Sequence, residues 1–268
     1  MRILAVSTDK AIQKRALVTG AAGGLGREVA VQLAMRGCAV GIADINAAGT
    51  AETARLVEAA GGEVVAIVGD FTLEGAPEAA VSQVVKRWGG IDILVNNAGY
   101  GVIEPFLDSS FKSWTRTLAL NVTALAMACK AAGRVMREQR SGRIINITSP
   151  GSRMALPDYT AYTASKAGVD SITRALAVAM APYGVLVNSL APGMMDTEMQ
   201  RSTEVELARV NGRSADLQAF LDERTRRVPL GRRAEIAEVA EAVVWLCLDS
   251  PAYMTAERLN MSGGLDKD

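Results

Sequence analysis

A tyrosine and a lysine four residues apart, Tyr162 and Lys166, are the side chains in this sequence best suited to move a proton. On a helix they lie on one face, one turn apart, so the Lys166 ammonium can lie beside the Tyr162 phenol. A phenol has a pKa of about 10, and a nearby cation lowers it by favouring the phenolate. The pair is therefore suited to exchange a proton with an alcohol or a carbonyl oxygen. The same spacing also occurs in helices as an exposed aromatic beside a solvated lysine.

Ser149 precedes this pair and lies two residues after the predicted strand at 143–147, whose apolar residues are Ile144, Ile145 and Ile147. A hydroxyl at the carboxyl end of a strand can hydrogen-bond the same substrate oxygen. The sequence contains no histidine, which excludes Ser-His-Asp and Cys-His catalysis and any histidine-bound metal. Tyr, Lys, Cys, Asp and Glu remain as candidate general acids and bases, and we expect no metal site.

The composition indicates one globular domain. The 268 residues are 49% hydrophobic, enough for one large core, and the formal net charge is zero with dispersed basic residues. We therefore expect no nucleic-acid or membrane partner.

Cys38, Cys129 and Cys247 suggest buried thiols in a reducing compartment. Residues 1–13 lack the long apolar segment of a signal peptide, and no apolar run reaches the length of a membrane span, so we expect a cytoplasmic protein with a short N-terminal extension.

A glycine-rich stretch near the N-terminus lies between a predicted strand at 16–18 and a predicted helix at 27–35. The N-terminus of such a helix offers free N–H groups and a positive dipole end, which favour a pyrophosphate. Glycine lets the backbone approach the phosphates, although turns use glycine for other reasons too. The candidate cofactor-binding residues here are Gly20, Gly23, Gly24, Leu25 and Gly26.

An acidic residue, Asp44, ends the second predicted strand at 39–43. It lies about 20 residues beyond the glycines, where a carboxylate can accept hydrogen bonds from the adenosine ribose. Its charge would repel a 2′-phosphate, and Gly23, Ile45 and Asn46 offer no cation to hold one. We therefore expect NAD rather than NADP. Asp44 can also cap the following helix, and the two roles can coexist.

Strands and helices alternate along the rest of the chain. Further strands are predicted at 64–68, 91–95, 143–147, 185–188 and 258–261, and further helices at 52–60, 77–88, 111–136, up to about 181, and 236–248. The alternation predicts an α/β fold for the single domain 1–268: one Rossmann-like doubly wound parallel sheet of about seven strands, with helices on both faces. The polar segment 194–232 follows a strand end, where a substrate-binding lid is expected.

Two more strands end in residues suited to contact a ligand. Asp70 and Phe71 follow one strand, and Asn97, Ala98 and Gly99 follow the next, at the edge where open α/β sheets bind ligands. An ordinary turn explains these residue types equally well.

Asn121 is unusual within a predicted helix, because its amide competes for backbone hydrogen bonds. From the residues alone, a partly exposed polar side chain is the favoured interpretation. A kink that holds a water is the alternative.

Taken together, these segments resemble the short-chain dehydrogenase/reductase family of the classical type. The resemblance extends from about Lys14 to Gly264. Each motif alone is modestly specific, whereas their order and spacing are distinctive. The matching residues are 19–26, 96–99, Asn121, Ser149, Tyr162 with Lys166, and Pro192 and Gly193 with Thr197.

The resemblance implies a catalytic tetrad of Asn121, Ser149, Tyr162 and Lys166. Tyr162 is then the general acid and base, and Ser149 steadies the substrate oxygen. Lys166 lowers the pKa of Tyr162 and holds the nicotinamide ribose. Asn121 positions a water in a proton relay that starts at Lys166.

The resemblance also assigns cofactor contacts. It implies that Asp70 lies near the adenine and Asn97 near the adenine-side ribose. The residues Pro192, Gly193, Met195 and Thr197 are then at the nicotinamide end, the last two meeting its carboxamide. A homotetramer, or a homodimer, is the implied assembly.

The sequence departs from the family's habits at four positions. Pro150 follows the implied catalytic serine, which stiffens the local backbone. Leu186 replaces a common arginine, Ala256 a frequent glycine and Ser262 a frequent aspartate. The last two fall in the C-terminal segment that often contributes to the tetramer interface.

The segment 197–232 is similar to family members that act on diols and polyols, such as butanediol and sorbitol dehydrogenases. We therefore expect a secondary alcohol, diol or sugar alcohol as substrate. Reduction of a 3-oxoacyl thioester is the alternative, although Asp44 fits NADPH less well. A non-catalytic nucleotide-sensing protein is disfavoured by the presence of Tyr162 and Lys166. An epimerase or dehydratase of an extended fold is disfavoured because roughly 75 residues after Pro192 are too few for a second domain.

Overall fold

The computed structural model describes residues 13–266 as one parallel sheet covered by helices on both faces. The strands lie side by side in the order β3-β2-β1-β4-β5-β6-β7, and each neighbouring pair is parallel. Their bounds are β1 (Arg15–Thr19), β2 (Ala39–Asp44), β3 (Val64–Val68), β4 (Ile93–Asn96), β5 (Gly142–Ile147), β6 (Val185–Pro192) and β7 (Arg258–Met261). The predicted doubly wound sheet of about seven strands is confirmed.

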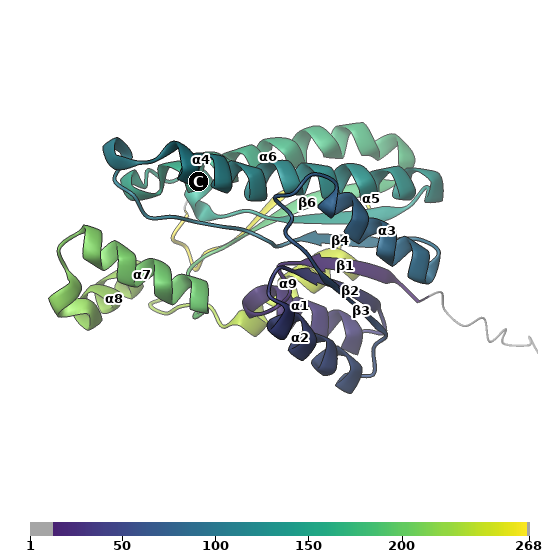
Figure 1. The fold of residues 1–268 in the computed structure, drawn as a ribbon, viewed down its shortest axis with the longest axis horizontal. Helices are drawn as coiled ribbons and strands as arrows, with labels where there is room; N and C mark the ends of the chain where they lie inside the picture. The colour runs from purple at the N-terminus through teal and green to yellow at the C-terminus, as the bar shows by residue number, and fades with distance from the viewer. Residues whose placement is uncertain (1–12, 267–268) are drawn as a thin grey trace, which may run out of the picture.

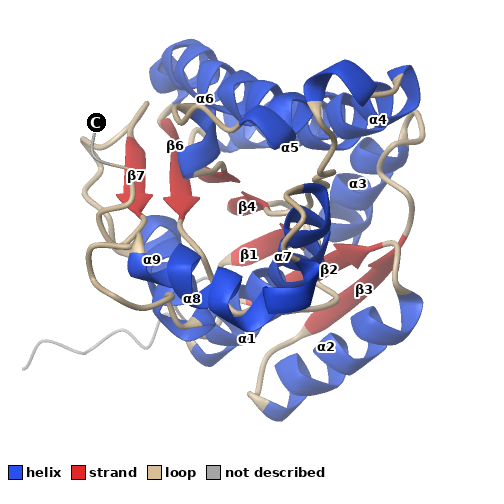
Figure 2. Cartoon of the chain, turned by 90° about the vertical axis from the view of Figure 1, so that its left-hand side faces the viewer, coloured by secondary structure: helices blue, strands red, loops and turns tan. Residues whose placement is uncertain are grey.

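The helices form two layers (Figures 1 and 2). One layer comprises α1 (Gly24–Met35), α2 (Ala47–Ala59) and α9 (Ile236–Leu248), and the other α3 (Ala76–Trp88), α4 (Phe111–Leu118), α5 (Leu125–Gln139) and α6 (Thr160–Met180). Two apolar clusters, one on each face of the sheet, fill the space beneath these layers. The remaining helices, α7 (Glu198–Val210) and α8 (Leu217–Arg226), project from the carboxyl end of the sheet as a separate arm.

The chain reverses direction across the sheet between β1 and β4. It winds outward from β1 to β3 and then returns to place β4 beside the other edge of β1. The loops that leave these two strands diverge to opposite sides, which opens a crevice at their carboxyl ends. The fold therefore places the loops after β1 and β4 at the same crevice.

Two predicted boundaries differ from the structure for identifiable reasons. The helix expected at 52–60 begins at Ala47, because the Asn46 side chain accepts a hydrogen bond from the Gly49 N–H at 3.1 Å and caps it. The strand expected at 185–188 continues to Pro192, because β7 pairs with its second half.

The single helix predicted at 111–136 is interrupted. Residues Ala119–Ala124 form a π-helical segment between α4 and α5. Such insertions occur frequently at functional sites, and this one contains Asn121.

The composite helix Phe111–Gln139 also meets the length and composition of a membrane span, with a mean hydropathy of 1.2 in one window. The expectation that no segment reaches that length is wrong by this measure. Length and composition are a weak indication, since core helices of soluble proteins pass the same test. This helix packs on α3, α6 and the sheet, so we interpret it as a core helix.

The departure at Ala256 has a structural consequence. Its φ of 66° lies in the left-handed region, where glycine is favoured. An alanine there costs on the order of 1 kcal/mol relative to glycine.

Ser262, another departure from the family pattern, is buried. Its hydroxyl accepts a hydrogen bond from the Asp266 N–H at 3.1 Å, which fixes the end of the described chain.

Candidate active site

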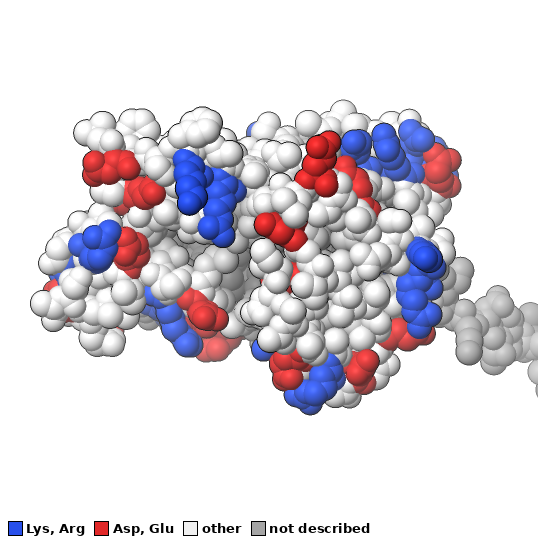
Figure 3. All heavy atoms as spheres, in the orientation of Figure 1, with Lys and Arg blue, Asp and Glu red and all other residues white. Residues whose placement is uncertain are grey.

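A cleft of about 1210 Å³ lies along the carboxyl ends of the strands and extends under the α7–α8 arm. Figure 3 shows the hollow between this arm and the body of the molecule. Nearly all the predicted site residues line it: Gly20, Gly23, Gly24, Leu25, Asp44, Ile45, Asp70, Phe71, Asn97, Ala98, Gly99, Ser149, Tyr162, Lys166, Pro192, Gly193, Met195 and Thr197. Gly26 and Asn121 are the two predicted residues that do not.

The glycine turn leaves open space at the N-terminus of α1. Gly20 and Gly24 have φ values of 65° and 51°, and a Cβ on Gly23 would meet no atom within 4 Å. A Cβ on Gly26 would instead overlap the Gly20 carbonyl oxygen. Gly26 therefore serves close packing, whereas Gly23 faces the space that a pyrophosphate would fill.

Asp44 is held at the end of β2 by backbone donors. One carboxylate oxygen accepts from the Ala22 N–H at 3.1 Å and the other from the Asn46 N–H at 2.9 Å. Asn46, and not Asp44, caps α2. The capping role considered for Asp44 is therefore wrong, and its carboxylate instead joins β2 to the glycine turn within the cleft.

Asp70 and Asn97 are fixed by their own loops. Asp70 accepts hydrogen bonds from the Thr72 hydroxyl at 2.7 Å and the Thr72 N–H at 2.9 Å, which lower the pKa of its carboxyl group. The Asn97 amide donates to the carbonyl oxygens of Thr19 and Gly20 at 3.0 and 2.9 Å. Asn97 thus ties the end of β4 to the glycine turn and sets the width of the crevice.

Tyr162 and Lys166 lie one turn apart on α6, as predicted. The Lys166 ammonium nitrogen is 5.7 Å from the centre of the Tyr162 ring and donates to the Ile147 carbonyl oxygen at 2.9 Å. Burial raises the pKa of Tyr162, and a hydrogen bond with the Ser149 side chain acts in the opposite direction. In the chain by itself the pKa of Tyr162 is therefore raised and not lowered as expected, because the effect of burial exceeds that of the Ser149 hydrogen bond.

Lys166 itself is buried, with 5% of its surface exposed. Burial lowers its pKa to about 8, and the charge of Asp170, one turn further along α6, partly opposes that shift. An ammonium group with this pKa can gain or lose a proton near neutral pH.

Asn121 is buried within the π-helical segment, contrary to the favoured interpretation from sequence. Its carbonyl oxygen accepts from the Tyr100 N–H at 2.7 Å. Its amide donates to the Tyr100 carbonyl at 2.8 Å and to the Ser165 hydroxyl at 2.9 Å. Asn121 thus joins the loop after β4 to the helix that carries Tyr162 and Lys166. Tertiary contacts satisfy an amide that would be unfavourable in an isolated helix.

A buried cluster of charged residues, which sequence reasoning missed, contacts the backbone of Ser149. The Arg258 guanidinium donates to the Ser149 carbonyl oxygen at 3.0 Å and to the Asp266 carboxylate at 2.8 Å, and it lies 3.3 Å from Asp170. The Arg258 side chain is only 7% exposed. Because Arg258 and Ser149 are 109 positions apart, no local sequence pattern indicates the contact.

Other residues that line the cleft were also missed. They come from α4, from the loop before α6, from the loop after β6 and from the arm: Phe111, Lys112, Thr115, Arg116, Met154, Leu156, Tyr159, Met194, Thr203, Arg224 and Arg227. Among them, the Tyr159 ring lies 6.3 Å from the Tyr162 ring. None of these residues forms a motif in the sequence, so only the fold identifies them.

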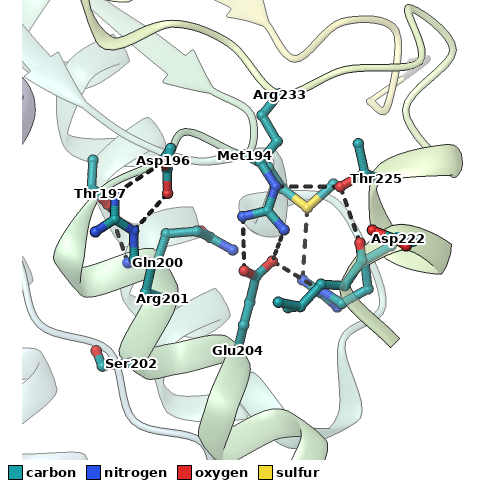
Figure 4. A network of polar contacts seen from close by, with 12 residues as sticks. Met194, Asp196, Thr197, Gln200, Arg201, Ser202, Glu204, Asp222, Thr225 and Arg233 are labelled. Carbon is teal, nitrogen blue, oxygen red and sulfur yellow. Dashed lines mark hydrogen bonds and ion pairs between the residues drawn. The ribbon is translucent and has the colours of Figure 1, made fainter. Parts of the chain in front are cut away.

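The arm is held by a buried carboxylate, Glu204 of α7, with 1% of its surface exposed. Arg233, which precedes α9, donates to both Glu204 oxygens at 2.8 and 3.1 Å (Figure 4). Arg224 of α8 approaches one of the same oxygens at 3.4 Å. The three side chains join both arm helices to the main body.

Replacing Lys166 with methionine is expected to stabilise the protein. Because the pKa of Lys166 is lowered on folding from its ordinary value to about 8, the ammonium disfavours folding fully below pH 8 and progressively less as the pH rises toward 10.5. The substitution should raise the free energy of unfolding at pH 7 on the order of 2 kcal/mol, and by about 1 kcal/mol less at pH 9. Urea unfolding at the two pH values measures both quantities. The exposed Lys112→Met is the control, and an equal change in both variants would contradict the argument.

Known proteins resemble this chain over nearly its whole length. The family described as enoyl-(acyl carrier protein) reductase matches residues 20–266. L-2,3-butanediol dehydrogenase of Corynebacterium glutamicum is 32% identical over 257 residues, which are 95% of this chain and 99% of that protein. The structure of NAD+-bound xylitol dehydrogenase superposes with a TM-score of 0.91 at 33% identity, covering 95% of this chain and 100% of that one. That of actinorhodin polyketide ketoreductase with NADPH has a TM-score of 0.91 at 33% identity, covering 96% and 98%.

Proposed function

Because the chain belongs to the short-chain dehydrogenase/reductase family and is an oxidoreductase that acts on CH–OH groups, we propose that it interconverts a secondary alcohol and its ketone with NAD as cofactor. The alcohol is a diol, a polyol or a sugar alcohol. The observation that carries the proposal is the meeting of Tyr162, Lys166 and Ser149 in the cleft that contains the open glycine turn.

The cleft has the features that a dinucleotide requires. The backbone at Gly23 is open, and the α1 N-terminus lies beside it. In our proposal Leu25, Gly20 and Gly24 surround the pyrophosphate, and Asp44 accepts hydrogen bonds from the adenosine ribose. When bound, NAD would supply the hydride acceptor.

The remaining predicted contacts complete the cofactor site. We place Asp70 and Phe71 near the adenine and Asn97 to Gly99 near the ribose and ring. We place four residues at the nicotinamide: Pro192, which ends β6, and Gly193, Met195 and Thr197, which follow it. The positive charge of an oxidised nicotinamide would favour the Tyr162 phenolate, which the chain by itself disfavours.

The proposed choice of NAD rests on Asp44 alone. One similar structure holds NAD+ and another NADPH, so overall likeness does not discriminate between the two. Asp44 and its neighbours Ile45 and Asn46 place one negative charge and no cation where a 2′-phosphate would lie.

We assign proton transfer to Tyr162. It accepts the hydroxyl proton when the alcohol is oxidised and returns a proton to the carbonyl oxygen when the ketone is reduced. Ser149 hydrogen-bonds the same substrate oxygen and orients it. Lys166, with a pKa of about 8, holds the nicotinamide ribose and can pass the proton onward. Asn121, fixed to Tyr100 and Ser165, is proposed to position a water at the start of that path.

Reduction of a 3-oxoacyl thioester is the second candidate. The similar ketoreductase structure favours it, whereas Asp44 does not. For either reaction we propose a cytoplasmic homotetramer or homodimer, with residues 194–232 as the substrate lid. The molar mass in solution, measured by light scattering, tests the assembly.

The first experiment is NADH formation, followed by absorbance, on a panel of vicinal diols, polyols and simple secondary alcohols with NAD or NADP. Turnover of a diol or polyol with NAD supports the proposal. Absence of turnover in a protein that still binds NADH overturns it. The 3-oxoacyl alternative is then assayed in the direction of reduction.

A further inference from the structure

The substrate end of the cleft contains an arginine, Arg224, close to the proposed reacting group. Its side chain is 21% exposed and lines the cleft. One guanidinium nitrogen lies 3.9 Å from the Met194 sulfur, and the guanidinium carbon lies 5.8 Å from the centre of the Phe220 ring. Its charge acts on Tyr159, whose ring is 6.3 Å from that of Tyr162. Arg224 and Tyr162 therefore line the same cleft, and Tyr159 relates to both.

The charge of Arg224 is only partly balanced by its neighbours. Glu204 is shared between two guanidinium groups, and Arg233 occupies both of its oxygens at 2.8 and 3.1 Å (Figure 4). Arg224 reaches that carboxylate through Nε alone, at 3.4 Å. Within residues 13–266 its Nη1 atom makes no hydrogen bond. One carboxylate thus faces two cations, which leaves one positive charge at the wall of the cleft.

The other charges around this end of the cleft do not cancel the excess. The acidic residues that line the cleft are Asp44 and Asp70, at the ends of β2 and β3, and the exposed Glu198. Four cations besides Arg224 line it: Lys166 at Tyr162, Arg227, which pairs with Glu223 at 2.6 Å, and Lys112 and Arg116 on α4, the second of which acts on Asp70. Figure 3 shows basic side chains, with acidic ones next to them, on both sides of the hollow. The positive charge at the arm side of the cleft therefore comes from Arg224, and it favours an anion.

We propose that the substrate carries a carboxylate and that Arg224 binds it, an inference that rests on the proposed dehydrogenase function. A guanidinium group matches the planar geometry of a carboxylate through paired N–H donors. The excess of one charge fits a monoanion better than a phosphate ester, which carries nearly two negative charges at neutral pH. The substrate class is then hydroxycarboxylates, with the carbinol at Tyr162 and the acid group at the arm.

The test compares each acid with its neutral amide of the same shape. The probes are 3-hydroxybutyrate and 3-hydroxybutyramide, 4-hydroxypentanoate and 4-hydroxypentanamide, and 4-hydroxycyclohexanecarboxylate and its carboxamide, each with NAD. In at least one pair, kcat/KM of the native protein should be at least about tenfold higher for the acid, since hydrogen bonds to charged groups contribute this much. Arg224→Gln should reduce that ratio at least about tenfold, mainly through KM of the acid.

The matched control is Arg226→Gln, which removes an exposed arginine of the same helix that does not line the cleft. It should leave the ratio unchanged. If Arg224→Gln lowers the rates of acid and amide equally, Arg224 only supports the arm and the inference is wrong. A preference for a phosphate ester over the acid of similar length overturns it as well.

Neutral diols, assayed in parallel, separate this inference from the proposed function. Turnover of diols with no preference for acids overturns the inference alone. If no alcohol is turned over, the proposed function fails, and binding decides the inference: pentanoate should stabilise the NADH-loaded protein against heat more than pentanamide does. Equal stabilisation by the two compounds contradicts it.

Discussion

Replacing Tyr162 with phenylalanine is expected to lower kcat by about a thousandfold or more while cofactor affinity stays within about twofold. The substitution removes only the phenol oxygen, which lies beside the Ser149 side chain and within the cleft. No histidine exists in the chain to replace it, and Lys166 already donates to the Ile147 carbonyl oxygen. A solvent water is the remaining acceptor, and it lacks the orientation that a fixed side chain provides.

The measurement is steady-state turnover of the best alcohol found, together with NADH binding followed by its fluorescence. Tyr100→Phe is the control, because Tyr100 does not line the cleft and meets Asn121 only through its backbone. That variant should keep native turnover. If Tyr162→Phe retained kcat within tenfold of the native value, the assignment of the acid and base would be wrong.

The residues that sequence predicts best are those whose function depends on local spacing. Tyr162 and Lys166 are joined by one helical turn, and the glycines lie in one strand–turn–helix unit. Local geometry fixes such groups before any long-range contact forms. The sheet could be predicted for a similar reason, because alternating strands and helices admit few topologies.

Contacts between distant segments explain what sequence reasoning missed. Asn121 appears exposed when only helix propensity is considered, and its burial depends on partners at Tyr100 and Ser165. Arg258 reaches Ser149 across 109 positions, and Arg233 reaches Glu204 across 29. In each case a polar or charged side chain is stable inside the protein only because a distant partner meets it. The residues next to such a side chain in the sequence do not indicate which distant residue will be its partner.

The direction of the Tyr162 pKa shift could not be predicted from the sequence, for a different reason. Spacing predicted correctly that Lys166 would lie close to the ring, but not that its ammonium would bind the Ile147 carbonyl oxygen. The pKa of Tyr162 depends on how strongly burial and nearby charges act on the phenol, and these effects change over a few ångströms. The spacing of two residues in the sequence does not specify such distances.

Substitution of Asp44 is expected to change the cofactor preference, which is the second large effect. Removing its charge and adding a cation, as Asp44→Ala combined with Ile45→Arg, should lower the ratio of kcat/KM for NAD over NADP by about 100-fold. Asp44 is fixed between the Ala22 and Asn46 N–H groups, so its charge cannot move away from a 2′-phosphate. Ile45 is 65% exposed at the cleft, which gives an arginine room to reach that phosphate. Relief of like-charge repulsion and a charge-assisted hydrogen bond together contribute about 3 kcal/mol, which corresponds to that ratio.

Two single variants separate the contributions. Asp44→Asn removes the charge and keeps one of the two acceptor oxygens, enough for either the Ala22 or the Asn46 N–H group, so it should weaken the preference for NAD less than the double variant does. Ile45→Gln adds a long polar side chain without charge and should leave the ratio nearly unchanged. Initial rates with both cofactors at several concentrations provide the measurement. A native protein that already prefers NADP, or a double variant with an unchanged ratio, would show that Asp44 does not contact the ribose, and the proposed choice of NAD would then lose its only structural support.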